Sequence, residues 1–112
     1  MKNVNRILLV LALAALVALA PALWASGNAE TGKALYDKKC ASCHAKDGAG
    51  NPAIAKAMKV ELRHLGAKEV QAKSDADLKK DTVEGVGKMK GIKLTDAEWA
   101  DVLAYMRTLK QK

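Results

Sequence analysis

The sequence predicts a small all-α domain built from three to four short helices. Two observations favour helices. Two segments start with the capping pattern of Ser or Thr followed three residues later by an acid, and the C-terminal segment has an apolar stripe with helical spacing. A third observation argues against a sheet, because no segment alternates apolar and polar residues over the length of a useful strand. A chain of 112 residues has room for one domain.

The N-terminal segment is expected to direct export rather than to join the domain. An almost unbroken apolar run follows Lys2 and Arg6, is broken by Pro21 and ends in small residues. This pattern is typical of a secretory signal peptide, so we expect residues 1–25 to be removed, residues 26–112 to form the domain, and the product to lie in the periplasm. An uncleaved membrane anchor is the alternative, because the run is about as long as the ~20 apolar residues that span a bilayer.

The charge of the domain argues against nucleic-acid binding. The only charged residues within 1–25 are two cations, so the net charge falls from +7 for the chain to +5 for the domain. Lysines alternate with acids along the domain, and no basic stripe is interleaved with aromatic residues. Solvated helix faces account for this pattern, and complementarity to an acidic protein partner is the more specific interpretation.

The first half of the domain is expected to contain one helix and a turn-rich loop. Residues 32–39 have helical composition and should have the next segment, 40–44, at their C-terminal end. Residues 46–52 are rich in Gly, Asp, Asn and Pro and predict a loop, and residues 52–58 form a short alanine-rich stretch.

Two helices are expected in the second half. Ser74 and Asp77 resemble a capping box at the start of a helix that Gly85 stops. Thr95 and Glu98 form a full capping box at the start of the last helix. Its apolar stripe predicts a face turned toward the core: Trp99, Val102, Leu103, Met106 and Leu109.

The pentapeptide at residues 40–44 predicts covalent attachment of a haem. Cys40, Cys43 and His44 are spaced i, i+3 and i+4, so on a helical turn they share one face and point at the same flat ligand. Two cysteines followed directly by a histidine are the pattern of c-type haem attachment. The thiols would become thioethers with the haem vinyl groups, and His44 would be the proximal iron ligand.

Three other interpretations of these residues are weaker. A Cys₂His₂ zinc site would need His64, which lies twenty residues from His44 rather than the usual three to five. A thioredoxin-like redox pair needs a βαβ context, which the sequence lacks. A disulfide between Cys40 and Cys43 would be strained and would leave the adjacent histidine without a role.

The second axial position of the iron has four candidate ligands in the domain. Met106 belongs to the apolar stripe and is expected in the core, and Met58 is expected to pack as a pocket wall. Met89 lies in the glycine-rich segment 85–91 between two helices, where a loop can approach a cofactor closely, so it is the predicted distal ligand. His64 remains the rival, and an exposed loop methionine without a ligand role remains the simpler alternative at residue 89.

From about residue 30 to residue 109 the chain resembles a bacterial class I cytochrome c. The matching features are Gly32 and Tyr36, the Cys40–His44 pentapeptide, residues 47–52 of the following loop, Gly87-Lys-Met89, and the segments 94–98 and 102–109. The resemblance implies the class I cytochrome c fold around one haem c, bound covalently through Cys40 and Cys43. It also implies His44 as proximal and Met89 as distal ligand, and an electron-transfer protein rather than an enzyme.

The resemblance implies two further contacts and shows two departures. Gly32 and Tyr36 should meet Tyr105 where two helices cross, and a backbone carbonyl near Pro52 should accept the ring N–H of the proximal histidine. Many relatives have proline where Lys90 follows the methionine. Relatives commonly have an acidic residue where this chain has a histidine at position 64.

The function expected from the sequence is single-electron transfer by a periplasmic monohaem cytochrome c. The alternatives are a haem c subunit of a respiratory complex and a ligand-binding or peroxidase-like haem protein with a bis-histidine or open distal site. Redox proteins with acidic docking surfaces are the expected partners. A membrane is expected only through an uncleaved N-terminal segment or docking to a respiratory complex. The lysines expected around the haem edge are Lys38, Lys39, Lys46, Lys88, Lys90 and Lys93.

Overall fold

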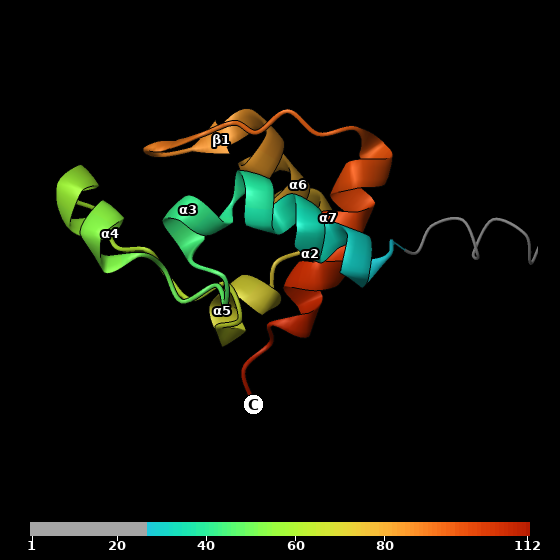
Figure 1. The fold of residues 1–112 in the computed structure, drawn as a ribbon, viewed down its shortest axis with the longest axis horizontal. Helices are drawn as coiled ribbons and strands as arrows, with labels where there is room; N and C mark the ends of the chain where they lie inside the picture. Colours follow the sequence, from blue (N-terminus) through green and yellow to red (C-terminus); the bar gives the residue numbers. More distant parts are fainter. Residues whose placement is uncertain (1–26) are drawn as a thin grey trace, which may run out of the picture.

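The computed structural model describes residues 27–112, so the expected signal peptide lies outside the described residues (Figure 1). The all-α prediction is confirmed, with six helices in this part of the chain, two of which are four-residue turns. In order, the elements are α2 (Ala29–Lys39), α3 (Ala41–His44), α4 (Pro52–Met58), α5 (Lys68–Gln71), α6 (Asp75–Glu84), β1 (Gly85–Val86), β2 (Met89–Lys90) and α7 (Asp96–Thr108). Between residues 27 and 112, every helix is too short or too polar to cross a bilayer.

Both predicted caps form at the starts of α6 and α7. The Ser74 hydroxyl accepts a hydrogen bond from the backbone N–H of Asp77 at 3.1 Å. At α7 the Thr95 hydroxyl accepts from the N–H of Glu98 at 3.1 Å, and the Glu98 carboxylate accepts from the N–H of Thr95 at 3.4 Å. These bonds satisfy N–H groups that the first turn of a helix leaves without partners. They set the starting points of the two helices that enclose the 85–91 segment.

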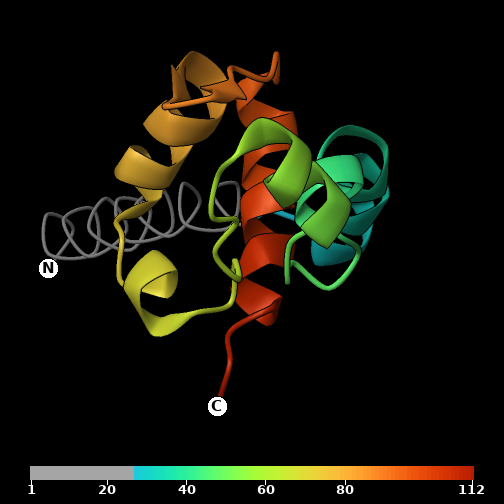
Figure 2. The ribbon, with the colours of Figure 1, turned by 90° about the vertical axis from the view of Figure 1, so that its left-hand side faces the viewer.

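Helices α2 and α7 approach each other closely at their backbones. A Cβ atom at Gly32 of α2 would overlap the carbonyl of Asp101 on α7, so only a glycine allows the two helices to approach this closely. One turn later, the rings of Tyr36 and Tyr105 pack edge to face with centroids 5.1 Å apart. The helix contact implied by the resemblance is therefore present. Figure 2 shows α7 in the centre, with α2 on one side and α5 and α6 on the other.

The core forms where α6 packs against α7. Leu78, Trp99, Val102 and Met106 are buried, with Met106 only 6% exposed, so its prediction as a core residue is confirmed. Leu103 and Leu109 of the predicted stripe are half-buried. The partly buried residues packed against this cluster come from the rest of the domain: Leu35, Leu65, Val70, Leu94 and Leu103.

The short helix α5, which the sequence did not predict, is tied to α7 by polar groups. The Gln71 amide donates to the carbonyls of Leu65 and Met106 at 2.9 and 3.1 Å. Arg107 in turn donates to the Gln71 carbonyl at 2.7 Å and to the Asp75 carboxylate at 2.6 Å. These bonds close the side of the domain remote from α2.

Replacing Gly32 with alanine should destabilise the domain. Gly→Ala inside a helix ordinarily adds up to about 1 kcal/mol of stability, but here the new methyl group overlaps a backbone carbonyl and forces α2 and α7 apart. We expect Gly32→Ala to lower the free energy of unfolding by about 2 kcal/mol, measured by urea unfolding followed by circular dichroism. The exposed neighbour Thr31 supplies the control, since Thr31→Ala should stay within about 0.5 kcal/mol. A raised stability for Gly32→Ala would contradict the packing argument.

Candidate haem-binding site

The Cys-x-x-Cys-His segment forms a separate helical turn, α3, which begins directly after α2 ends at Lys39. Cys40 ends α2 with φ −124° and ψ −35°, and its N–H still donates to the Tyr36 carbonyl at 2.8 Å. The Cys40 carbonyl then accepts from the N–H groups of Cys43 and His44 at 3.2 and 3.0 Å. The motif therefore lies at the C-terminal end of this helix, as predicted, and forms a separate turn there. The i, i+3, i+4 relation of the three side chains is nevertheless present.

The loop after this turn folds back onto it. The N–H groups of Gly50 and Asn51 donate to the carbonyls of His44 and Cys43, both at 2.8 Å. These carbonyls lie at the C-terminal end of α3, where a helix leaves acceptors without internal partners. The bonds place Asn51 beside the motif, and its side chain caps α4 by accepting from the N–H of Ala53 at 3.0 Å.

Two tyrosine hydroxyls hold the residues that follow His44. Tyr36 donates to the carbonyl of Ala45 at 2.6 Å, and Tyr105 donates to the carbonyl of Lys46 at 3.0 Å. Tyr36 is completely buried, and this burial raises the pKa of its hydroxyl, so the group stays a neutral donor. Ala45 needs this support, because its φ of +61° lies in the left-handed region that residues with a side chain rarely adopt. The two helices that cross at Gly32 thus also determine where the haem motif ends.

The side chains of the motif are chemically suited to bind a haem. Neither cysteine is in a disulfide, so each sulfur could form a thioether with a haem vinyl group, and burial raises the pKa of the Cys40 thiol. Burial lowers the pKa of His44, which favours the neutral imidazole that can donate a lone pair to iron.

His44, the predicted proximal ligand, lacks the backbone partner that the resemblance implies. Its Nδ1 is buried and has no hydrogen-bond partner within residues 27–112, so the expected bond to a carbonyl near Pro52 is not formed. The carbonyls of the adjacent turn are used instead by the backbone N–H groups of Gly50 and Asn51. A metal-ligating histidine usually donates its second ring N–H to such an acceptor, and this bond is absent from the described part of the chain.

Met89 lies on a short antiparallel ribbon between α6 and α7. Val86 pairs with Met89 and Gly85 with Lys90, and Gly87 turns the chain with φ +56°. Directly opposed residues of such a pair have their side chains on the same face, so Met89 and Val86 share one face of the ribbon. Met89 is half-buried, whereas Val86 is 53% exposed.

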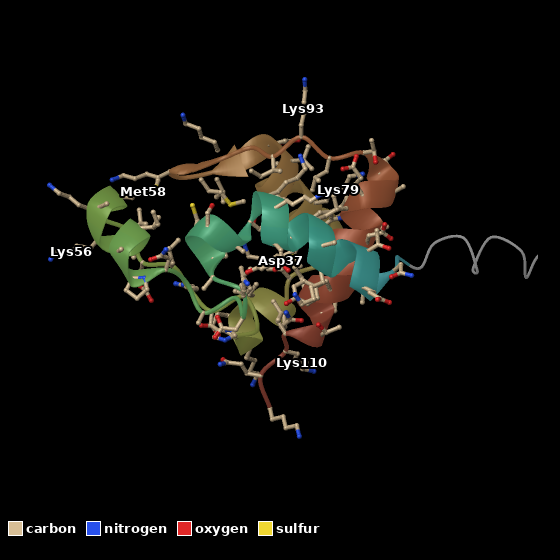
Figure 3. The ribbon with its side chains drawn as sticks, viewed as in Figure 1. Asp37, Lys56, Met58, Lys79, Lys93 and Lys110 are labelled. Atoms are coloured by element: carbon tan, nitrogen blue, oxygen red, sulfur yellow. The ribbon has the colours of Figure 1, made fainter. Side chains whose placement is uncertain are left out.

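Exposed apolar side chains flank the motif from two directions. The large apolar residues that are exposed within residues 27–112 are Met58, at the end of α4, and Val86, on the ribbon. Figure 1 shows the ribbon extending over α3 toward α4, and Figure 3 labels Met58 at the end of α4 that faces the ribbon. These two exposed apolar side chains lie on α4, which follows the motif, and on the ribbon that carries the predicted distal ligand. Met58 is 37% exposed, so it does not pack in the core of the described domain, and its place in the wall of a haem pocket stays a prediction.

The remaining candidate ligands lie elsewhere. Met106 is in the core, and the Nδ1 of His64 accepts a hydrogen bond from the N–H of Gly66 at 2.9 Å, next to Leu109 and the end of α7. Across residues 27–112, no three His, Cys, Asp or Glu side chains gather as a metal-binding group, which argues against the zinc site. The described part of the chain therefore supports the haem interpretation of the Cys40–His44 turn.

Two contacts that the sequence reasoning did not predict help to build this site. Asn51 joins the motif to α4, and the pair Asn51-Pro52 is a recognisable start of a helix. Lys88 donates to the carbonyl of Met58 at 2.7 Å. No local pattern announces that contact, because its two residues are thirty positions apart in the chain.

Comparison with known proteins gives one family. The family model described as Cytochrome c matches residues 29–110, a range that begins with α2 and extends past the end of α7. No curated protein matches the chain.

Proposed function

The chain belongs to the cytochrome c family, and on that premise we propose that it is a periplasmic electron carrier with one haem, whose iron is ligated by His44 and Met89. Proteins of this family bind haem c covalently and carry electrons, and Cys40 and Cys43 fit the attachment motif. The chain contains two cysteines in all, which suffice for one such motif, and this supports a single haem.

The observation that carries the proposal is the pair of elements that flank one site. The turn of α3 presents two thiols and a neutral imidazole, and the ribbon between α6 and α7 presents a half-buried methionine together with an exposed valine. His44 and Met89 would occupy both axial positions, so external ligands would be kept out. The haem, when bound, supplies an iron that accepts and releases one electron.

The residues of the chain would keep this ligand set unchanged during electron transfer. The two tyrosine bonds hold the segment after His44, and the bond from the Ile92 N–H to the Thr82 carbonyl ties the base of the Met89 ribbon to α6. A methionine ligand raises the reduction potential relative to a second histidine. A closed ligand set suits an electron carrier and leaves no position for a substrate, which is why we propose a carrier rather than an enzyme.

Removing the Met89 side chain tests the ligand assignment. We expect the oxidised protein to show a methionine–iron charge-transfer band, and Met89→Ala to abolish that band completely while the haem stays attached. The reduced variant should also bind carbon monoxide, because its distal position is then open. Met58→Ala is the control, since this exposed methionine should leave the band and the carbon monoxide reaction unchanged. A wild-type protein that lacks the band and binds carbon monoxide readily would favour a ligand-binding or peroxidase-like haem protein.

The partners that we propose are redox proteins with acidic docking surfaces. Six lysines support this: all are exposed, and the ion pairs found between residues 27 and 112 involve other side chains. They are located at the end of α2, in the loop after the motif, and on or near the ribbon: Lys38, Lys39, Lys46, Lys88, Lys90 and Lys93. Figure 3 shows Lys93 pointing away from the body of the domain. Unpaired positive charge of this kind steers anionic partners.

The rate of oxidation by ferricyanide tests this positive surface. We expect the rate to fall about tenfold between about 0.01 and 0.15 M ionic strength, because the Debye length shrinks from about 30 to about 8 Å. At low salt, the double change Lys39→Gln with Lys90→Gln should slow the reaction several-fold. The control is Lys110→Gln with Lys112→Gln at the C-terminus, which is remote from Lys93 in Figure 3 and should have a smaller effect. A rate independent of salt would count against electrostatic docking.

Export is proposed from the N-terminal pattern of a basic start, an apolar run and small residues. Mass analysis of the protein from the periplasmic fraction should give a polypeptide that starts near Ser26 and carries the added mass of one haem. Recovery of the full-length chain in the membrane fraction would instead indicate an anchor or a subunit of a respiratory complex. A bare polypeptide mass would contradict haem attachment itself.

A further inference from the structure

Helix α4 has almost no apolar attachment to the rest of the domain. None of its seven residues is buried, so its position depends on hydrogen bonds at its two ends. At its start, the backbone N–H of Asn51 donates to the Cys43 carbonyl at 2.8 Å, and the side-chain amide of Asn51 donates to the Ser42 carbonyl at 3.2 Å. The start of α4 is therefore tied directly to the haem-binding turn.

The end of α4 is tied to the Met89 ribbon by one lysine. The ammonium of Lys88 donates to the carbonyl of Met58, the last residue of the helix, at 2.7 Å. A helix C-terminus leaves such carbonyls without internal partners and has a negative dipole end, so a cation is favoured there. Lys88 occupies the turn of the ribbon and directly precedes Met89 in the chain.

The ribbon has firm attachments only at its base. The N–H of Ile92 donates to the Thr82 carbonyl at 2.8 Å, where the ribbon leaves α6. A two-stranded ribbon of two residues per strand has little stability by itself. Among the described residues, Lys88 supplies the one hydrogen bond from its turn to another element.

These hydrogen bonds form a continuous series between the two predicted iron ligands, His44 and Met89. It leads from the turn of His44 through Asn51 to α4, and from Met58 through Lys88 to Met89. We propose that Lys88 is a positioning residue for Met89: its bond to the Met58 carbonyl keeps the ribbon over the haem-binding turn and so favours Met89 over external ligands at the iron. This inference rests on the proposed ligation by His44 and Met89.

Competition with imidazole for the iron of the oxidised haem protein tests the role of Lys88. Lys88→Met keeps the length of the side chain but lacks the ammonium, and we expect it to bind imidazole about fivefold more tightly than the wild type. This ratio corresponds to the about 1 kcal/mol that one hydrogen bond contributes. The matched control is Lys90→Met, which removes the same charge from the same ribbon but no hydrogen bond within residues 27–112. Its affinity for imidazole should stay within about twofold of the wild type, a ratio well below the effect of one hydrogen bond.

Two further variants separate positioning from general effects. Lys88→Arg retains a cationic donor and should restore most of the wild-type resistance to imidazole, whereas Lys88→Gln should resemble Lys88→Met. Equal imidazole affinities for Lys88→Met and Lys90→Met would overturn the inference, because the effect would then be one of charge alone. Failure of the proposed function is recognised separately: if the wild-type charge-transfer band is absent or survives Met89→Ala, the ligation itself is wrong and the role of Lys88 falls with it.

Discussion

The backbone contact between α2 and α7 at Gly32 is the constraint on which the haem-binding turn depends. Without a Cβ at this position the two helices can touch, and Tyr36 and Tyr105 then meet one turn later. Their hydroxyls reach the carbonyls of the two residues after His44. A single missing side chain at a helix crossing therefore decides where His44, the proposed proximal ligand, lies. Because Tyr36 is completely buried, its bond acts in a medium of low dielectric constant, where an unpaired carbonyl would be costly.

Much of this arrangement could be predicted from the sequence, because the signals involved are local. The caps at Ser74 and Thr95 depend on residues within four positions of one another, and both were found as predicted. The haem motif is equally local, since its three side chains share one helical turn. The apolar stripe of α7 has a spacing that only a helix explains, and the burial of Trp99 and Met106 confirms it.

The features that could not be predicted depend on contacts between distant segments. The single turn of α5 is too short to show a period, and it is stabilised by Arg107 of α7 through the Gln71 carbonyl. The bond between Lys88 and Met58 joins a turn to a helix end thirty residues away, so neither residue shows it alone. Helix propensity and the spacing of apolar residues do not predict contacts between such distant residues.

The two predicted iron ligands are supported by contacts of different strength. The carbonyls of the turn that contains His44 accept hydrogen bonds from the following loop. The two residues after His44 are held by the hydroxyls of Tyr36 of α2, which is buried, and Tyr105 of α7. Met89 belongs to a ribbon that is exposed at its tip. One hydrogen bond, from the exposed Lys88 to the Met58 carbonyl, joins this ribbon to α4. Regions with few buried apolar contacts and solvent-exposed hydrogen bonds open at lower free energy than the rest of a fold. We therefore expect the ribbon that contains Met89 to open at lower denaturant concentration than the turn that contains His44. With the proposed ligation, the thioether bonds and the bond to His44 would then persist under conditions that break the bond to Met89.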